Sequence, residues 1–208
     1  DHPVDLGVCW MTEDSGAVLA ITESKDHTEL VQHLLVDASG NPVLSGSTSK
    51  LRRILEINSS AVDTLKFEGR SLKDEEVQAR ITATSSDDLA SLVYTSGTTG
   101  KPKGCILTHA NWLAEVRGLL TNPIGAIAVP GSRVLTFLPM AHVFSRAVSL
   151  AVAIGGATQN HWSDFSTLSM EFQRSRPNLI LGVPRVFEKV RNSAAQARHF
   201  RASRANCH

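Results

Sequence analysis

An eleven-residue stretch rich in glycine, hydroxyl groups and lysine is the feature that most constrains this chain. Residues 94–104 read Tyr-Thr-Ser-Gly-Thr-Thr-Gly-Lys-Pro-Lys-Gly, and largely apolar runs flank them at 89–93 and 105–107. Glycines let backbone N–H groups turn toward an anion without a Cβ atom in the way, and successive N–H groups in such a turn form a positively polarised concavity. Hydroxyls add hydrogen-bond donors and lysine adds charge. A loop of this kind, leaving a buried strand, is suited to hold a polyphosphate.

The spacing of these residues excludes two familiar phosphate loops. The Walker pattern requires a glycine five residues before Gly100, where the chain has Thr95. It also requires a serine or threonine at the position of Pro102. The dinucleotide pattern Gly-x-Gly-x-x-Gly is missing from this stretch as well. Gly97 and Gly100 alone match the Gly-x-x-Gly of KH nucleic-acid loops, and they equally fit an ordinary surface turn.

The complete string resembles the signature of the acyl-adenylating enzymes, which include acyl-CoA synthetases, luciferases and adenylation domains of peptide synthetases. These enzymes make an acyl-adenylate from a carboxylic acid and ATP and pass the acyl group to a thiol. The resemblance implies a cradle for the β- and γ-phosphates, a cationic arm made of Lys101 and Lys103, and a Mg²⁺ ligand in the hydroxyl of Thr95. The cradle residues are Thr95, Ser96, Gly97, Thr98, Thr99 and Gly100.

Composition and charge agree with a cytoplasmic enzyme domain. The 208 residues suffice for one domain with a core. The net charge of +1 provides no general attraction to nucleic acid or membranes. The three cysteines, Cys9, Cys105 and Cys207, are far apart, so neither a disulfide framework nor a zinc site is indicated and a reducing cytoplasm fits. We interpret Cys105, among apolar neighbours, as a small buried residue rather than a nucleophile.

The ends of the sequence and its apolar stretches support further expectations. The chain begins with Asp1 rather than methionine, which suggests a fragment or a processed product, and no signal peptide is visible. The longest weakly charged stretch, 147–156, is shorter than the ~20 residues of a membrane-spanning helix. We expect that stretch to be a buried helix.

Hydrophobic periodicity predicts an α/β protein with a mostly parallel sheet flanked by helices. Strands are predicted at 17–22, 51–57, 89–93, 133–138, 157–162 and 178–181. Helices are predicted at 26–35, 73–81, 109–120, 140–154, 164–174 and 184–190. Ligands of such sheets bind beyond the carboxyl ends of the strands, and we expect the loop after residue 93 to lie at such an end.

A second string, Leu-Pro-Met-Ala-His-Val-Phe at 138–144, contains His142. The resemblance implies that His142 lies beside the acyl-binding pocket and the α-phosphate, where a neutral imidazole would donate a hydrogen bond. We take His142 as the candidate catalytic residue. The alternative is a histidine that only satisfies the start of a helix.

A third string indicates which branch of the family is involved. Residues 183–189 read Val-Pro-Arg-Val-Phe-Glu-Lys. This string resembles one that is typical of long-chain acyl-CoA synthetases. The resemblance implies that residues 182–184 border the fatty-acid tunnel and that the cofactors and substrates are ATP, Mg²⁺, CoA and a fatty acid. Arg185, Glu188 and Lys189 are interpreted as packing residues. No nucleic-acid partner is expected, peripheral contact with a membrane fits the substrate, and the oligomeric state is open.

The resemblance places a partial AMP-binding domain at 1–193, as part of the large N-terminal domain of such an enzyme. The sequence lacks the family's acidic magnesium segment, its ribose-binding segment and its small C-terminal domain. We therefore expect this chain by itself to be weakly active or inactive. Residues 194–208 form a basic tail that matches nothing in the family. It is interpreted as disordered or out of frame, or as an arm for acidic lipids. A non-catalytic nucleotide-binding remnant and an adenylating enzyme for another acid remain alternatives.

Overall fold

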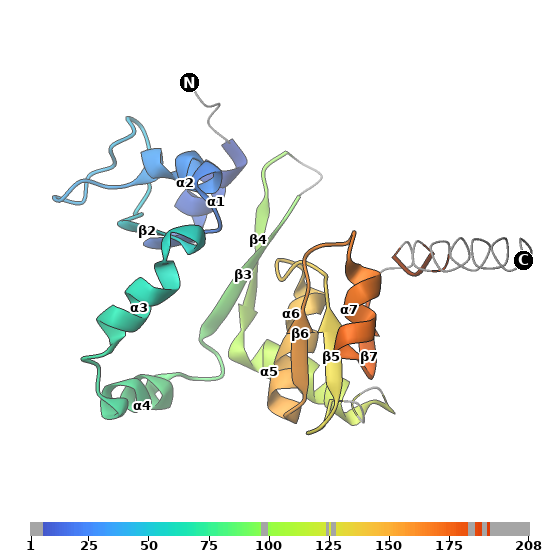
Figure 1. Cartoon of the computed structure of the whole chain (residues 1–208). Coiled ribbons are helices and arrows are strands. Elements are labelled where there is room, and N and C mark those ends of the chain that lie inside the picture. Colours follow the sequence, from blue (N-terminus) through green and yellow to red (C-terminus); the bar gives the residue numbers. More distant parts are fainter. Residues whose placement is uncertain are drawn as a thin grey trace, which may run out of the picture. The chain divides into compact units, whose positions relative to one another are not determined.

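The structure, which is a computed structural model, contains both helices and strands along the whole of the described chain (Figure 1). It describes residues 6–96, 100–123, 125, 128–182, 186–188 and 191. The chain divides into two compact units, Asp1–His109 and Ala110–His208. Parallel strand pairs occur in both units, so the predicted α/β class is confirmed.

In the first unit, a parallel pair of strands packs with the helix that connects them. Strand β1 (Leu19–Thr22) pairs with β2 (Arg53–Glu56), and both agree with the predicted strands. Helix α2 (Lys25–Val31) and the 3-10 turn η1 (Gln32–Leu34) lie between them in the sequence. The N-cap of α2 is Ser24, so the helix begins one residue before the predicted range of 26–35. The core cluster contains Val31, Leu34 and Leu51.

The described part of this unit contains three further α-helices, and only one of them was predicted. Helix α4 (Asp74–Ala83) agrees with the prediction for 73–81, and all its residues are exposed. Helices α1 (Leu6–Ser15) and α3 (Ala61–Gly69) were not predicted. The apolar residues of α1 do not lie on one face of the helix, so its sequence lacks the apolar stripe from which helices are recognised. Every residue of α1 is exposed or half-buried.

The glycine-rich stretch lies in an antiparallel hairpin, not after a parallel strand. Strand β3 (Leu89–Thr95) pairs antiparallel with β4 (Lys103–Thr108), and Thr95 lies opposite Lys103. The predicted position at a parallel-sheet edge is therefore wrong. Strand direction is set by the pairing partner, which periodicity does not encode.

Cys105 is exposed, so its predicted burial is also wrong. The described strands β3 and β4 form a two-stranded sheet. The neighbouring Ile106 is 68% exposed as well, so the apolar composition of this run does not reflect burial within the unit.

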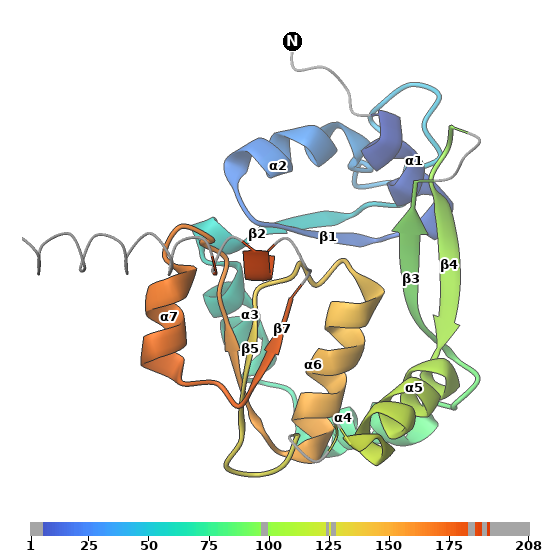
Figure 2. The same cartoon turned by 90° about the vertical axis from the view of Figure 1, so that its right-hand side faces the viewer.

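The second unit contains a parallel sheet of order β6-β5-β7. The central strand is β5 (Arg133–Thr136), and its neighbours are β6 (Thr158–His161) and β7 (Leu179–Leu181). The helices are α5 (His109–Thr121), α6 (Val143–Gly155) and α7 (Leu168–Ser175) (Figure 2). All six elements agree in type and approximate position with the predicted ones.

Successive residues of β5 point to opposite faces of the sheet, and each face is covered. Val134 packs with Val148 and Val152 of α6. Leu135 packs in a separate cluster with Leu168 of α7. Strands covered on both faces read as continuous apolar runs, which explains why the run at 133–138 predicted a buried strand.

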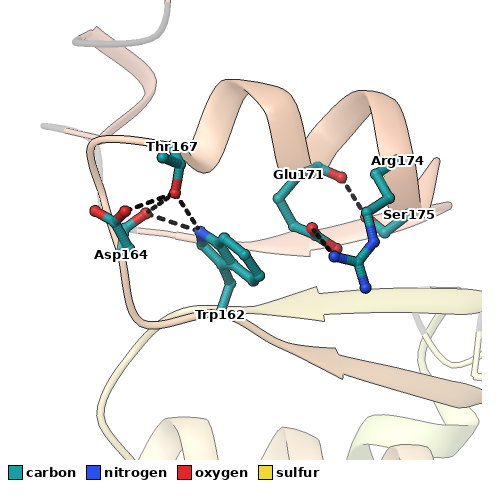
Figure 3. Close-up of polar contacts among 6 residues, drawn as sticks. All are labelled: Trp162, Asp164, Thr167, Glu171, Arg174 and Ser175. Atoms are coloured by element: carbon teal, nitrogen blue, oxygen red, sulfur yellow. Dashed lines mark hydrogen bonds and ion pairs between the residues drawn. The ribbon is translucent and has the colours of Figure 1, made fainter.

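The turn before α7 is built by a tryptophan, an aspartate and a threonine (Figure 3). The indole Nε1 of Trp162 donates to the carbonyl oxygen of Asp164 at 2.8 Å and to Oγ1 of Thr167 at 3.2 Å. The Asp164 carboxylate accepts hydrogen bonds from the hydroxyls of Ser166 and Thr167, and these bonds lower the pKa of Asp164. Residues 164–167, predicted as helix, are therefore the turn that precedes it.

Candidate functional site

The two strand ends of the hairpin place several predicted phosphate-binding residues together. Thr95 ends β3 and Lys103 begins β4, and the two are direct cross-strand partners. Thr95, Ser96, Gly100, Lys101 and Lys103 are all exposed. Gly97, Thr98 and Thr99 lie outside the described residues. Gly100 has a φ of +97°, a backbone conformation that favours glycine.

Lys101 lies against an aromatic ring from the first helix. Its Nζ is 4.1 Å from the ring centroid of Trp10, which is a cation–π geometry. The indole Nε1 of Trp10 donates to the carbonyl oxygen of Pro102 at 2.9 Å. One side chain of α1 therefore contacts two consecutive residues immediately before β4.

The opposite strand is tied to the same helix through Tyr94. Its hydroxyl donates to Oδ2 of Asp14 at 2.7 Å. Burial, reinforced by the Asp14 carboxylate, raises the pKa of Tyr94 to about 12. The tyrosine ring also passes across Gly104, where an added Cβ atom would lie 3.0 Å from Tyr94 Cζ. The last glycine of the string thus makes room for the tyrosine ring.

The carboxylate of Glu13 interacts electrostatically with Lys101. Glu13 Oε1 accepts hydrogen bonds from the Ser47 hydroxyl at 2.5 Å and from the Thr48 backbone N–H at 3.0 Å. These bonds, with a smaller contribution from the charge of Lys101, lower the pKa of Glu13. Glu13 is hydrogen-bonded to Ser47 and Thr48, and the ammonium of Lys101 is exposed. The ammonium is therefore able to bind a further anion besides the Glu13 carboxylate.

His142 occupies the residue before α6 in the second unit, and it is exposed. Its backbone N–H donates to the carbonyl of Pro139 at 3.0 Å, and its own carbonyl accepts from Arg146 at 3.1 Å. The fully buried hydroxyl of Ser145 donates to the carbonyl of Leu138 at 3.1 Å. The turn that carries His142 is thus fixed from its interior side. A catalytic role for His142 stays a prediction.

Polar side chains at the ends of β5 and β6 form a network that the sequence did not reveal. Oγ1 of the buried Thr136 contacts Nδ1 of His161 and Nε2 of Gln159, each at 3.1 Å. Gln159 Nε2 also donates to the Ser149 hydroxyl of α6 at 2.7 Å. The contact of His161 with Thr136 links the ends of the two neighbouring strands.

Gly182 lies where two phenylalanine rings approach the backbone. An added Cβ atom would be 2.9 Å from Phe137 Cζ and 3.1 Å from Phe187. Residues 183 and 184, also predicted to border the acyl tunnel, lie outside the described residues. Packing alone explains the glycine, and its part in a tunnel stays a prediction.

The described residues contain no group of three or more histidine, cysteine, aspartate or glutamate side chains that could hold a metal ion. The role of the Thr95 hydroxyl as a Mg²⁺ ligand stays a prediction. Trp10 and Asp14 are supporting residues that sequence reasoning missed. No spacing rule links residue 10 to residue 102, which lies 92 positions later.

Known proteins resemble this chain in sequence and in fold. The AMP-binding enzyme family matches residues 7–206, a range that extends into the segment 194–208. The long-chain-fatty-acid–CoA ligase FadD15 of Mycobacterium tuberculosis is 40% identical over 193 residues. That alignment covers 91% of this chain and 30% of the ligase, so the chain spans less than a third of this relative's length.

Solved structures share the fold at low sequence identity. The inhibitor-bound N-terminal domain of FACL13 from Mycobacterium tuberculosis has a TM-score of 0.65 at 20% identity, covering 91% of this chain and 43% of that one. The o-succinylbenzoate coenzyme A synthetase of Bacillus subtilis, solved with ATP and magnesium ion, has a TM-score of 0.59 at 21% identity. That match covers 88% of this chain and 33% of the synthetase. Because the family model matches nearly the whole length of the chain, the chain belongs to the AMP-binding enzyme family.

Proposed function

We propose that the chain takes part in ATP-dependent activation of a long-chain fatty acid to an acyl-adenylate and its ligation to CoA. Support comes from the family match and from the 40% identity to a long-chain-fatty-acid–CoA ligase. Because the chain spans 30% of that ligase, we further propose that the 208 residues alone are weakly active or inactive.

In this proposal the hairpin end binds the β- and γ-phosphates of ATP. The observation that carries it is the exposed cluster at the two strand ends, where Thr95 faces Lys103 across the sheet. The cradle consists of Thr95, Ser96, Gly97, Thr98, Thr99 and Gly100. Lys101 and Lys103 neutralise phosphate charge, and positive charge on the phosphates lowers the barrier to attack by a carboxylate.

The remaining roles in the proposal are assigned to two side chains. The Thr95 hydroxyl contributes one ligand to a Mg²⁺ that accompanies ATP. His142, at the start of α6, donates a hydrogen bond to the carboxylate or the α-phosphate. Each assignment rests on the position of the residue within its motif.

The first test is the binding of ATP with Mg²⁺ by isothermal titration calorimetry. A hydrogen bond to a charged group contributes about 1.5–3 kcal/mol, so Lys103→Ala is expected to weaken binding about tenfold or more. The control is Lys66→Ala, which removes an exposed lysine paired with Asp63 on α3. Equal affinities for Lys103→Ala and the unchanged chain would remove Lys103 from the site.

The cellular location also belongs to the proposal. Within the described ranges, no helix has both the length and the apolar character needed to cross a bilayer. We propose a cytoplasmic protein with peripheral membrane contact, since a long-chain fatty acid partitions into lipid. Co-sedimentation with phosphatidylcholine vesicles would test that contact.

A further inference from the structure

One face of helix α1 contacts both sides of the hairpin. Trp10 contacts Lys101 and Pro102, the two residues immediately before β4, and Asp14 accepts a hydrogen bond from the hydroxyl of Tyr94 on β3. Residues four apart lie on the same face of a helix, so Trp10 and Asp14 act together. The two strand ends that carry the predicted phosphate-binding residues are therefore attached to a single helix.

The contact with Trp10 fixes the position of the Lys101 ammonium without consuming its binding capacity. The nitrogen lies 4.1 Å from the ring centroid, so the ring takes one side of the ammonium group. A lysine ammonium has three N–H donors, and the Lys101 side chain is exposed, so donors remain for an anion. The hydrogen bond from the indole to Pro102 holds the next residue of the backbone at 2.9 Å.

Holding a flexible lysine before binding reduces the conformational entropy that is lost when the anion arrives. Lys101 has a long side chain with many rotamers in solution, and the ring restricts them. Glu13, a carboxylate that interacts electrostatically with Lys101, is hydrogen-bonded to Ser47 and Thr48 and does not replace the ring contact.

The geometry assigns to Trp10 the role of a positioning residue, which holds the Lys101 ammonium in place for the polyphosphate of ATP. The assignment rests on the proposed function, because it presumes that an anion binds at the hairpin end. Trp10 itself touches no substrate in this assignment and acts through Lys101.

The test compares substitutions of Trp10 in binding of Mg²⁺-ATP and of inorganic tripolyphosphate, a probe that lacks the adenosine. An exposed cation–π contact corresponds to a change in affinity of about two- to fivefold. We therefore expect Trp10→Leu to weaken both ligands by that factor. Trp10→Phe, which keeps a ring face, is expected to lose less.

A matched control uses the second cation–π pair of the same unit. Arg70 Cζ lies 3.7 Å from the ring centroid of Phe67 on α3. Phe67→Leu removes an equivalent pair and should leave both affinities unchanged. Equal losses in Phe67→Leu and Trp10→Leu would show a general destabilisation and overturn the assignment.

A double-mutant cycle with Lys101→Met separates positioning from simple structural support. If Trp10 acts through Lys101, Trp10→Leu has no further effect on affinity in the Lys101→Met background. If the two substitutions weaken binding independently, the assignment is wrong. Thermal unfolding of every variant identifies those that fail to fold. If Trp10→Leu fails to fold, Trp10→Phe takes its place in the cycle.

The failure of the assignment can be distinguished from failure of the proposed function. Binding of ATP that is insensitive to Trp10→Leu overturns the assignment and leaves the proposed function intact. Binding of tripolyphosphate without ATP, sensitive to Trp10→Leu, supports the assignment and contradicts the proposed nucleotide. If the unchanged chain binds neither ATP nor tripolyphosphate, the assignment and the proposed function are both overturned.

Discussion

Tyr94 is the only tyrosine of the chain, and it links the hairpin to α1. Its phenol is expected to ionise near pH 12, because burial and the Asp14 carboxylate both disfavour the phenolate. Since the folded pKa lies above the ordinary value of 10.0, the stabilisation is complete below pH 10 and is lost as the pH rises toward 12. Ultraviolet absorbance of the phenolate reports this single group.

Asp14→Asn is expected to move the titration of Tyr94 back toward pH 10.0, since it removes the carboxylate charge. Asp63→Asn, on the exposed helix α3, serves as a control for general charge effects. A midpoint at the ordinary value in the unchanged chain would contradict the contact between Tyr94 and Asp14.

At the residue scale, the motif was recognisable but its supports were not. Gly100 was expected to turn the backbone, and its positive φ confirms that geometry. Trp10 and Asp14 escaped prediction because their contacts join segments about eighty or more positions apart, and local patterns carry no information on such contacts. The exposure of Cys105 was missed for a related reason, since apolar neighbours do not tell which face of a strand is covered.

At the scale of elements, the glycine that ends α6 can be tested against a glycine inside α5. Gly156 has a φ of +78°, and an added Cβ atom would lie 3.2 Å from Pro130 Cγ. Gly156→Ala is expected to lower the free energy of unfolding by about 1–2 kcal/mol, the cost of a side chain in the left-handed conformation. Urea unfolding followed by circular dichroism measures the change.

Gly118→Ala provides the opposite expectation. Gly118 lies within α5, is exposed, and has no atom within 4 Å of an added Cβ. Alanine there should raise the free energy of unfolding by about 0.5–1 kcal/mol, because glycine loses more backbone entropy on folding. If both substitutions destabilised to the same extent, the difference in backbone conformation would not be the cause.

Elements of the second unit were predictable because their sequence patterns match their environment. Alternate residues of β5 meet α6 and α7, so four of the six residues at 133–138 are apolar. Helix α1 lacks such a pattern, and the pairing of β3 with β4 depends on a partner rather than on periodicity. Element type therefore followed from the sequence more reliably than pairing direction.

At the scale of the whole molecule, the preference among carboxylic acids is the informative measurement. In ATP–pyrophosphate exchange with a panel of acids, we expect this chain to show little or no exchange, and any exchange to require a long-chain fatty acid. The expectation follows from the identity to a long-chain-fatty-acid–CoA ligase of which the chain spans 30%. Faster exchange with amino or aryl acids would assign the chain to another branch of the family. Binding of ATP without any exchange would be consistent with a weakly active chain or with a non-catalytic remnant.

The attachment of the hairpin to α1 has a consequence for protein engineering. A two-stranded hairpin by itself is only marginally stable in water, and here a helix far upstream in the sequence fastens both of its strands. Grafting the eleven-residue string alone onto a foreign scaffold would leave its anchors behind. A transplant that is to keep this geometry must carry the helix with Trp10 and Asp14 as well.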